Sequence, residues 1–252
     1  MLGSQQLLNF ELFNKTLKTS TTMKKLVIST GAGISAESGI KTFRDADGLW
    51  ENYPVMEVAS HTGFLRNPEL IHKFYNERRA QLVNAKPNAA HYGLVELEKY
   101  FDVQVITQNV DDLHERAGSS KVLHLHGELM KMQSLKNENH VYTLDRDHLE
   151  TSTATRDQYG DPVRPFIVFF EEAVPNFTPA MKLVQDADIF VVIGTSLVVY
   201  PAASLINCVR PGKPIFYIDP NPARVDLDNV TVIKKPATEG VKELIETLKT
   251  MQ

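Results

Sequence analysis

Three short loops carry residues that could bind a nucleotide and move a proton, and each follows an apolar run. The first, Gly31-Ala32-Gly33, comes after the run at 26–30 and opens into a helix-forming stretch. Glycines let a backbone approach a pyrophosphate, and a helix start offers free N–H groups and the positive end of a dipole. The spacing of Gly31, Gly33 and Gly39 differs from the ordinary dinucleotide fingerprint. On this loop alone, a structural turn is as good an interpretation as a nucleotide site.

The second loop follows the apolar run at 103–107 and reads Gln108-Asn109-Val110-Asp111. Asn109 and Asp111 flank Val110, so in an extended chain their side chains point the same way. A carboxylate accepts a hydrogen bond from an amide, and an asparagine can hold a hydroxyl or a water. Taken by itself, the same Asn-Val-Asp sequence is also an ordinary polar turn.

Two histidines stand just before Gly127. His124 lies near the end of the run at 121–125, and His126 follows directly after that run. Imidazole suits a general base because its unperturbed pKa lies close to working pH. Strand alternation puts both rings on one face, so spacing does not choose between them. A lone histidine at a strand end is more often structural.

A tyrosine and an arginine, Tyr75 and Arg78, lie three residues apart on a predicted helix at 67–84. That spacing places both on one helix face. A phenol donor beside a guanidinium makes a receptor for a carboxylate. The alternative is a surface helix that happens to carry a tyrosine.

The elements that must position these residues alternate between apolar runs and amphipathic stretches. Continuous apolar strands with helices between them predict an α/β fold, a Rossmann-like parallel sheet with helices on both faces. Ligands bind such sheets at the carboxyl ends of the strands, where all three loops fall. The predicted strands are 26–30, 103–107, 121–125, 189–193, 214–219 and 230–233, and the predicted helices are 67–84, 89–100, 178–185, 201–208 and 240–251.

Two segments, at about 45–88 and 129–165, do not fit this alternation, and we predict that they form a smaller inserted lobe. The second is polar and shows few strand signals. Residues 1–22 are a polar extension that we expect to be poorly ordered, which leaves 23–252 as the folded domain that would carry any activity.

Composition excludes several classes of protein. With 27 basic and 31 acidic residues in 252, the net charge of −4 offers no basic surplus for nucleic acid. The sequence contains no stretch of about 18 apolar residues, so we expect no membrane-spanning helix. The single cysteine, Cys208, excludes an internal disulfide and a multi-cysteine zinc site, which fits a reducing cytoplasm.

Four motifs, in order, resemble the signatures of the sirtuin family. They are Gly31-Ala32-Gly33-Ile34-Ser35 through Thr42-Phe43-Arg44, the stretch at 107–114, His124-Leu125-His126-Gly127, and Gly194-Thr195-Ser196-Leu197 with the residues up to Ala203. The similarity runs from about residue 24 to about 250. Lys41 departs from it, since the family usually has proline there.

The resemblance implies an NAD-dependent protein lysine deacylase with acylated-lysine proteins as substrates. In that chemistry the acyl oxygen attacks the ribose carbon, nicotinamide leaves, and hydrolysis gives free lysine and O-acyl-ADP-ribose. His126 would be the base, because the family's catalytic histidine directly precedes the glycine, and Asn109 would assist. The implied NAD-binding residues are Gly31, Ala32, Gly33, Ile34, Ala36, Phe43, Arg44, Trp50, Gln108, Asn109, Val110, Asp111, Gly194, Thr195, Ser196, Asn221 and Ala237.

The acyl preference follows from the same resemblance. The Tyr75-x-x-Arg78 pair is similar to the mark of the class III bacterial type, which removes succinyl, malonyl or glutaryl groups, and Ala59 suits a roomier acyl pocket. We expect a deacetylase with desuccinylase and demalonylase activity. The implied substrate-binding residues are Tyr75, Arg78, Val168, Phe169 and Phe170.

Many sirtuins hold the small lobe with four cysteines on zinc, but this chain has no cysteine between Gly127 and Pro165. His140 and His148 match no common zinc motif, so we predict no metal. The lobe would then depend on its own packing, for example through Val141, Tyr142, Leu144 and Leu149.

A second departure is Glu171. The chain reads Phe169-Phe170-Glu171-Glu172 where the family typically has Trp-Phe-Gly-Glu, in a segment whose backbone pairs with the substrate peptide. Peptide binding is therefore where we expect a difference from the family.

Other functions on this fold stay open at this point. An NAD-dependent mono-ADP-ribosyltransferase or a non-catalytic NAD-sensing module would use the same loops, whereas the loop spacing disfavours a hydride-transfer dehydrogenase. The sequence does not name the protein targets, and it leaves the oligomeric state open, a monomer included.

Overall fold

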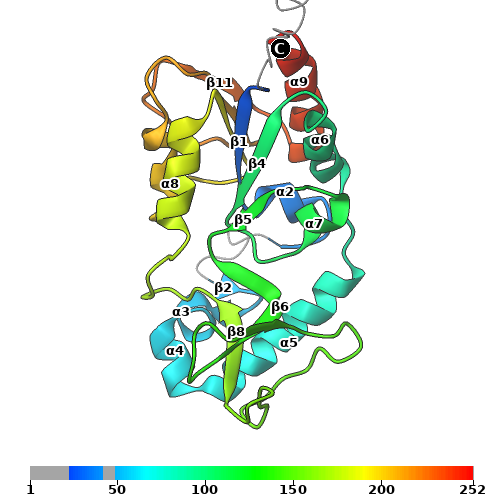
Figure 1. Ribbon diagram of the computed structural model, residues 1–252, viewed down its shortest axis with the longest axis vertical. Coiled ribbons are helices and arrows are strands. Elements are labelled where there is room, and N and C mark those ends of the chain that lie inside the picture. The colour runs from blue at the N-terminus through cyan, green and yellow to red at the C-terminus, as the bar shows by residue number, and fades with distance from the viewer. Residues whose placement is uncertain (1–22, 42–48, 252) are drawn as a thin grey trace, which may run out of the picture.

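A computed structural model describes residues 23–41 and 49–251. The predicted extension at 1–22, and two predicted NAD contacts, Phe43 and Arg44, lie outside these residues. Figure 1 shows two lobes stacked along the long axis, with a sheet of parallel strands in the larger lobe. The short helices α2 (Gly33–Ala36) and α7 (Leu113–Ala117) lie near the junction between the lobes.

The larger lobe is built on a six-stranded sheet with the order β11-β10-β9-β1-β4-β5, and every neighbouring pair is parallel. The chain winds outward from β1 in both directions, so the sheet has a switch point between β1 and β9, where α/β sheets bind ligands. The predicted α/β class is confirmed. The strands are β1 (Lys25–Thr30), β4 (Asp102–Thr107), β5 (Val122–His124), β9 (Ile189–Ile193), β10 (Ile215–Ile218) and β11 (Val230–Ile233).

Both faces of the sheet are covered. Helices α6 (Ala89–Leu97) and α9 (Ala237–Lys249) bury one face, and α8 (Phe177–Asp186) covers the other together with the segment Ala202–Cys208. That last segment, η2, lies where the sequence predicts a helix over 201–208, and the helix is of the 3-10 type. Its buried residues fall in pairs three apart, Ala202 with Leu205 and Ala203 with Ile206, which suits three residues per turn.

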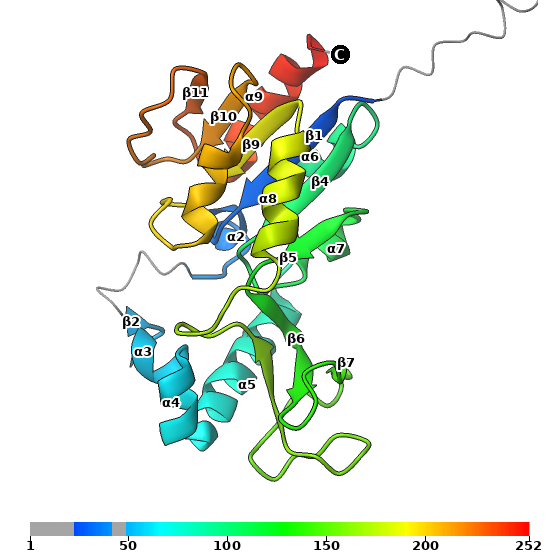
Figure 2. The same ribbon diagram turned by 60° about the vertical axis from the view of Figure 1, so that its left-hand side comes forward.

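The smaller lobe combines two stretches that are far apart in the chain (Figure 2). The first holds the helices, and the second forms a three-stranded antiparallel sheet with the order β7-β6-β8. Its elements are β2 (Leu49–Trp50), β3 (Tyr53–Pro54), α3 (Val55–Val58), α4 (His61–Arg66), α5 (Pro68–Asn84), β6 (Gly127–Ser134), β7 (Val141–Thr143) and β8 (Val163–Ile167).

The segment at 129–165 shows few strand signals in the sequence, yet it contributes to the three strands β6, β7 and β8. Polar Glu128, Lys131 and Gln133 on β6 are half-buried, while Leu129 and Met132 between them are buried. The strand has one covered and one open face, as antiparallel sheets allow.

The packing predicted for this lobe is mostly wrong as well. Of the four residues expected to hold it, only Leu149 packs against the lobe's buried cluster, which contains Phe74, Tyr75 and Phe169. The polar loop that follows β7 is instead fixed by Arg79, a fully buried side chain on α5. Its Nε donates to the carbonyl of Leu149 at 2.9 Å and its Nη2 to Oγ1 of Thr151 at 2.8 Å.

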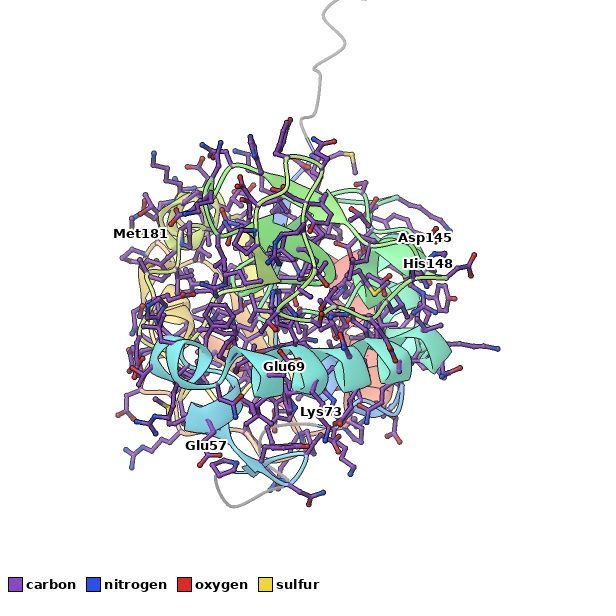
Figure 3. All side chains as sticks on the ribbon, turned by 90° about the horizontal axis from the view of Figure 1, so that it is seen from below. Glu57, Glu69, Lys73, Asp145, His148 and Met181 are labelled. Atoms are coloured by element: carbon purple, nitrogen blue, oxygen red, sulfur yellow. The ribbon has the colours of Figure 1, made fainter. Side chains whose placement is uncertain are left out.

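Neither a membrane span nor a metal cluster occurs among the described residues. No helix there is long and apolar enough to cross a membrane, and no three His, Cys, Asp or Glu side chains gather as metal ligands. His148 lies beside Asp145 on a loop at the edge of the lobe, away from Glu69 and Lys73 on α5 (Figure 3).

Candidate active site

Three glycines bring the ends of β1 and β9 into direct backbone contact. Gly31 N donates to the carbonyl of Ile193 at 3.0 Å, and Gly33 N donates to the carbonyl of Gly194 at 2.8 Å. A Cβ on Gly33 would lie 2.6 Å from Cα of Gly194, and Gly194 itself has a φ of +64°. The glycines are therefore needed for the two loops to touch each other, in addition to leaving room for a ligand.

Several backbone N–H groups along this contact make no hydrogen bond within the described residues. Among the described residues, those of Ala32, Thr195 and Ser196 donate to no acceptor, although they sit at the carboxyl ends of two neighbouring strands. Free N–H groups at such an edge form an anion-binding concavity. The arrangement fits a pyrophosphate.

Asn109, Asp111 and Ser35 form a buried triangle at the end of β4. Asn109 Nδ2 donates to Oγ of Ser35 at 3.1 Å, and that hydroxyl donates to Oδ2 of Asp111 at 3.0 Å. Asn109 and Asp111 thus point the same way, as their spacing predicts. Burial raises the pKa of Asp111 to about 6, against the opposing hydrogen bonds from Leu113 N and Ser35. An amide donor from a ligand would favour its charged form.

A second polar chain adjoins this triangle. Two of its members, Thr107 and His114, are the ends of the motif at 107–114, but no role is predicted for them from the sequence. Thr30 Oγ1 donates to Oγ1 of Thr107 at 2.9 Å and lies 3.0 Å from Nε2 of His114. Thr107 Oγ1 in turn accepts from the backbone N of Asn109 at 3.0 Å. All of these side chains are buried. Their only signal in the sequence is a threonine at the end of each strand.

The two histidines occupy different environments. Nδ1 of His126 lies 3.0 Å from the carbonyl of Gln108. Because a carbonyl only accepts, Nδ1 carries the proton and Nε2 keeps its lone pair. Burial lowers the pKa of His126, so the ring is neutral at pH 7. This is the state that a general base requires.

His124 has both ring nitrogens engaged. Nδ1 is 3.0 Å from the carbonyl of Asn109, and Nε2 is 2.8 Å from Oε1 of Glu115. Burial by itself would lower the pKa of His124, but the hydrogen bond and charge of Glu115 outweigh it and raise the pKa. A ring held at both nitrogens is a poor proton acceptor, so its role is structural.

Gln108 connects the two sides of the switch point. Its Nε2 donates to Oγ1 of Thr195 at 3.3 Å, while its backbone N donates to the carbonyl of Thr30 at 2.9 Å. The carbonyl of Thr195 accepts from the Tyr217 hydroxyl at 2.7 Å. These bonds set the distance between the loops after β1, β4 and β9.

Tyr75 and Arg78 lie in the small lobe, buried but incompletely paired. Among the described residues, the Tyr75 hydroxyl and the Nε and Nη1 atoms of Arg78 have no hydrogen-bond partner. The ring of Trp50 stands at 6.2 Å from that of Tyr75. A small cavity is lined by Arg78 and Trp50 and also by Val110 and Asp111, so these two groups of predicted residues share one space.

The segment from Val168 to Phe170 runs between the lobes. Val168 N donates to the carbonyl of His126 at 3.0 Å, and Phe170 N donates to the carbonyl of Ala59 at 2.8 Å. The side chain of Phe169 is buried, while that of Phe170 is 39% exposed. Val168, the first of these predicted substrate residues, therefore lies beside the predicted base His126.

The remaining predicted NAD contacts are spread along the same edge. Asn221 is exposed after β10, and Ala237 is buried at the first residue of α9. Ile34 is buried in the core, so only its backbone can face a ligand, whereas Ala36 is exposed. A larger groove between β5 and α8, lined by Lys121, Val122 and Lys182 among others, contains none of the predicted residues.

Comparison with known proteins agrees with this geometry. Residues 31–201 match the Sir2 family. An NAD-dependent protein deacylase of Bacteroides thetaiotaomicron is 52% identical over 230 residues, which covers 90% of this chain and 98% of that protein. An NAD-dependent protein deacylase of Helicobacter pylori is 52% identical over 227 residues, with 90% and 98% covered.

Solved structures give the same result. A Sir2 homologue in complex with ADP-ribose superposes with a TM-score of 0.82 at 39% identity, covering 94% of this chain and 96% of that one. A Sir2 homologue in complex with NAD has a TM-score of 0.80 at 39% identity, with 94% of each chain covered. A Sir2 protein with a deacetylated p53 peptide and 3′-O-acetyl ADP-ribose reaches 0.76 at 32% identity, with 94% and 98% covered.

Proposed function

The chain belongs to the Sir2 family, and on that premise we propose which of its residues perform each part of the reaction. It is an NAD-dependent protein deacylase that acts on acylated lysine side chains and yields O-acyl-ADP-ribose. NAD supplies the ribose carbon to which the acyl oxygen becomes joined as nicotinamide departs.

His126 is the general base. Its Nε2 accepts the proton of a ribose hydroxyl, and its Nδ1–H stays on the carbonyl of Gln108, which fixes the plane of the ring. The lowered pKa of His126 supports this role, because the ring is already neutral when substrate arrives. His126→Ala should leave the protein folded and reduce turnover about 100-fold or more.

The NAD-binding residues divide into two groups. The free N–H groups of Ala32, Thr195 and Ser196 hold the pyrophosphate. Asp111 accepts from the nicotinamide amide, and Asn109 orients a ribose hydroxyl or a water, both held in place by Ser35. The cavity is lined by Arg78 and Trp50 from one lobe and by Val110 and Asp111 from the other, so it would let the acyl group reach the ribose carbon of bound NAD.

The acyl group preferred is one that ends in a carboxylate. The observation that carries this proposal is the buried Tyr75 hydroxyl and Arg78 guanidinium, which leave three polar atoms without partners among the described residues. Nη2 of Arg78 lies 3.5 Å from Oε2 of Glu77, which compensates the buried charge only in part, so the pair is expected to receive an anion. A succinyl or malonyl carboxylate supplies both charge and acceptors.

The test is NAD-dependent turnover of one peptide that carries acetyl-, succinyl- or malonyl-lysine in parallel assays. Arg78→Met should reduce desuccinylation about 30- to 1000-fold, which corresponds to about 2–4 kcal/mol, and reduce deacetylation far less. Lys73→Met, an exposed cation on the same helix, is the matched control. Equal loss of both activities in Arg78→Met would defeat the proposal.

We further propose that the small lobe needs no zinc. The support is the buried network of Arg79 with the carbonyl of Leu149 and the hydroxyl of Thr151, which ties the loop after β7 to α5. In this lobe the buried guanidinium of Arg79 would stabilise the loop in the way that metal ligands do in many relatives.

A further inference from the structure

Helix α4 begins with three N–H groups that have no partner inside the helix, as every helix start does. Gly63 N donates to Oγ of Ser60 at 2.9 Å, which is an ordinary cap. The other two donate to the segment that follows β8. His61 N donates to the carbonyl of Phe170 at 3.0 Å, and Thr62 N donates to Oε2 of Glu171 at 2.8 Å.

Glu171 has a backbone conformation that favours glycine. Its φ is +75°, one of four positive values at non-glycine residues in the described part of the chain. Such a conformation costs energy for a residue with a Cβ and persists only where other contacts hold it. The carboxylate supplies such a contact, and the hydrogen bond from Thr62 N holds the pKa of Glu171 below its usual range.

The contacts around Glu171 decide which backbone groups of the segment stay free. Both backbone groups of Phe170 are used on the α4 side, and both of Phe169 bond to Glu172. The carbonyl of Val168 and the N–H and carbonyl of Glu171 have no partner among the described residues. These free groups are the ones an added strand would need.

We infer that Glu171 is a positioning residue, whose bond to Thr62 N fixes the segment from Val168 to Glu171 in its peptide-pairing conformation before the acylated peptide arrives. This inference rests on the proposed deacylase function and on the role predicted from the sequence for that segment in pairing with the peptide. With glycine at 171 the segment would gain freedom, and peptide binding would have to order it. The side chain therefore acts on affinity for peptide and not on the chemical step.

The experiment compares Glu171→Gly, Glu171→Gln and the wild type with an acylated peptide at saturating NAD. Glycine removes the carboxylate that accepts from Thr62 N, so it should raise the KM for peptide about threefold to tenfold. Because glycine also removes the conformational cost of the positive φ, kcat and the melting temperature should be unchanged or higher. Glutamine keeps a carbonyl oxygen for Thr62 N and should restore KM to within about twofold of the wild type. Glu138→Gln, an exposed glutamate in the β6–β7 loop, is the control.

An unchanged KM in Glu171→Gly overturns the inference, and so does a Glu171→Gln variant as poor as glycine, since charge would then be the cause. Amide hydrogen exchange separates this failure from failure of the underlying proposal. If peptide does not protect the amides at 168–171 of the wild type, the segment is not the docking strand and both fall. If peptide protects them while KM stays unchanged in Glu171→Gly, only the role of Glu171 is lost.

Discussion

Arg79 offers the sharpest test of how the small lobe is held together. The guanidinium is fully buried, and every partner among the described residues is neutral: the carbonyls of Leu149 and Leu129, Oγ1 of Thr151, Oδ1 of Asn76 and Sδ of Met132. Burial lowers the pKa of Arg79 to about 10, but the side chain stays charged at neutral pH. The cation is therefore compensated by neutral acceptors alone.

The effect of Arg79→Met can be worked out from these contacts. Thr151 and Asn76 can still satisfy each other, because Oγ1 of Thr151 lies 3.3 Å from Oδ1 of Asn76. The carbonyls of Leu149 and Leu129 lose a donor, and a buried unsatisfied acceptor costs about 1–3 kcal/mol. Removing a desolvated charge offsets part of this. We expect a net loss of about 2–4 kcal/mol, which is a large share of a typical folding free energy.

The assay is equilibrium unfolding in urea, joined with hydrogen exchange at the amides of 145–160. Arg66→Met, at an exposed arginine that ends α4, is the matched control and should change stability by less than about 0.5 kcal/mol. An Arg79→Met protein as stable as this control, with the loop still protected, would refute the argument that the guanidinium holds the lobe.

Two further predictions concern the large lobe. The buried His91 has its pKa lowered to about 4 by burial, whereas an unfolded histidine titrates near 6.5. The contribution of His91 to stability should thus be full above pH 6.5 and fall by about 1.4 kcal/mol per unit as the pH drops toward 4, and His91→Gln should reduce the slope of melting temperature against pH in this range. Gly33→Ala would place a Cβ 2.6 Å from the Gly194 backbone and should cost about 1–3 kcal/mol and weaken NAD binding, measured by calorimetry. NAD affinity unchanged in Gly33→Ala would contradict the proposed contact of the two loops.

The sheet could be predicted because parallel strands buried on both faces are continuous apolar runs. β9, for example, is Ile189–Ile193 with every residue buried. The lobe's strands escaped prediction for the opposite reason. On β6, charged Glu128 and Lys131 interrupt the apolar residues, and the pairing partner β8 lies some thirty residues away in the chain. Strand pairing over that distance leaves no local signal.

Within the candidate site, the sequence could predict only the contacts that follow from side chains alternating along one short segment. Alternation alone places Asn109 and Asp111 together. Nothing local shows that Ser35 joins them, because that contact requires β1 and β4 to be neighbours in a register that pairs Thr30 with Thr107. The same register creates the buried chain from Thr30 to His114.

His126 lies between β5 of the larger lobe and β6 of the smaller lobe, so its proposed role depends on how both lobes are held. Its Nδ1 bonds to the carbonyl of Gln108, which the ends of β1 and β9 hold in place. Its own carbonyl accepts from Val168 N, the first residue of the segment that Glu171 fixes against α4. A peptide paired with that segment would present its acyl-lysine beside the ring, while the large lobe would present NAD from the other side. Movement of either lobe would therefore change the distance between the proposed base and the substrate, so Arg79→Met should reduce turnover through His126 without touching it, whereas variants at Glu171 should change the KM for peptide.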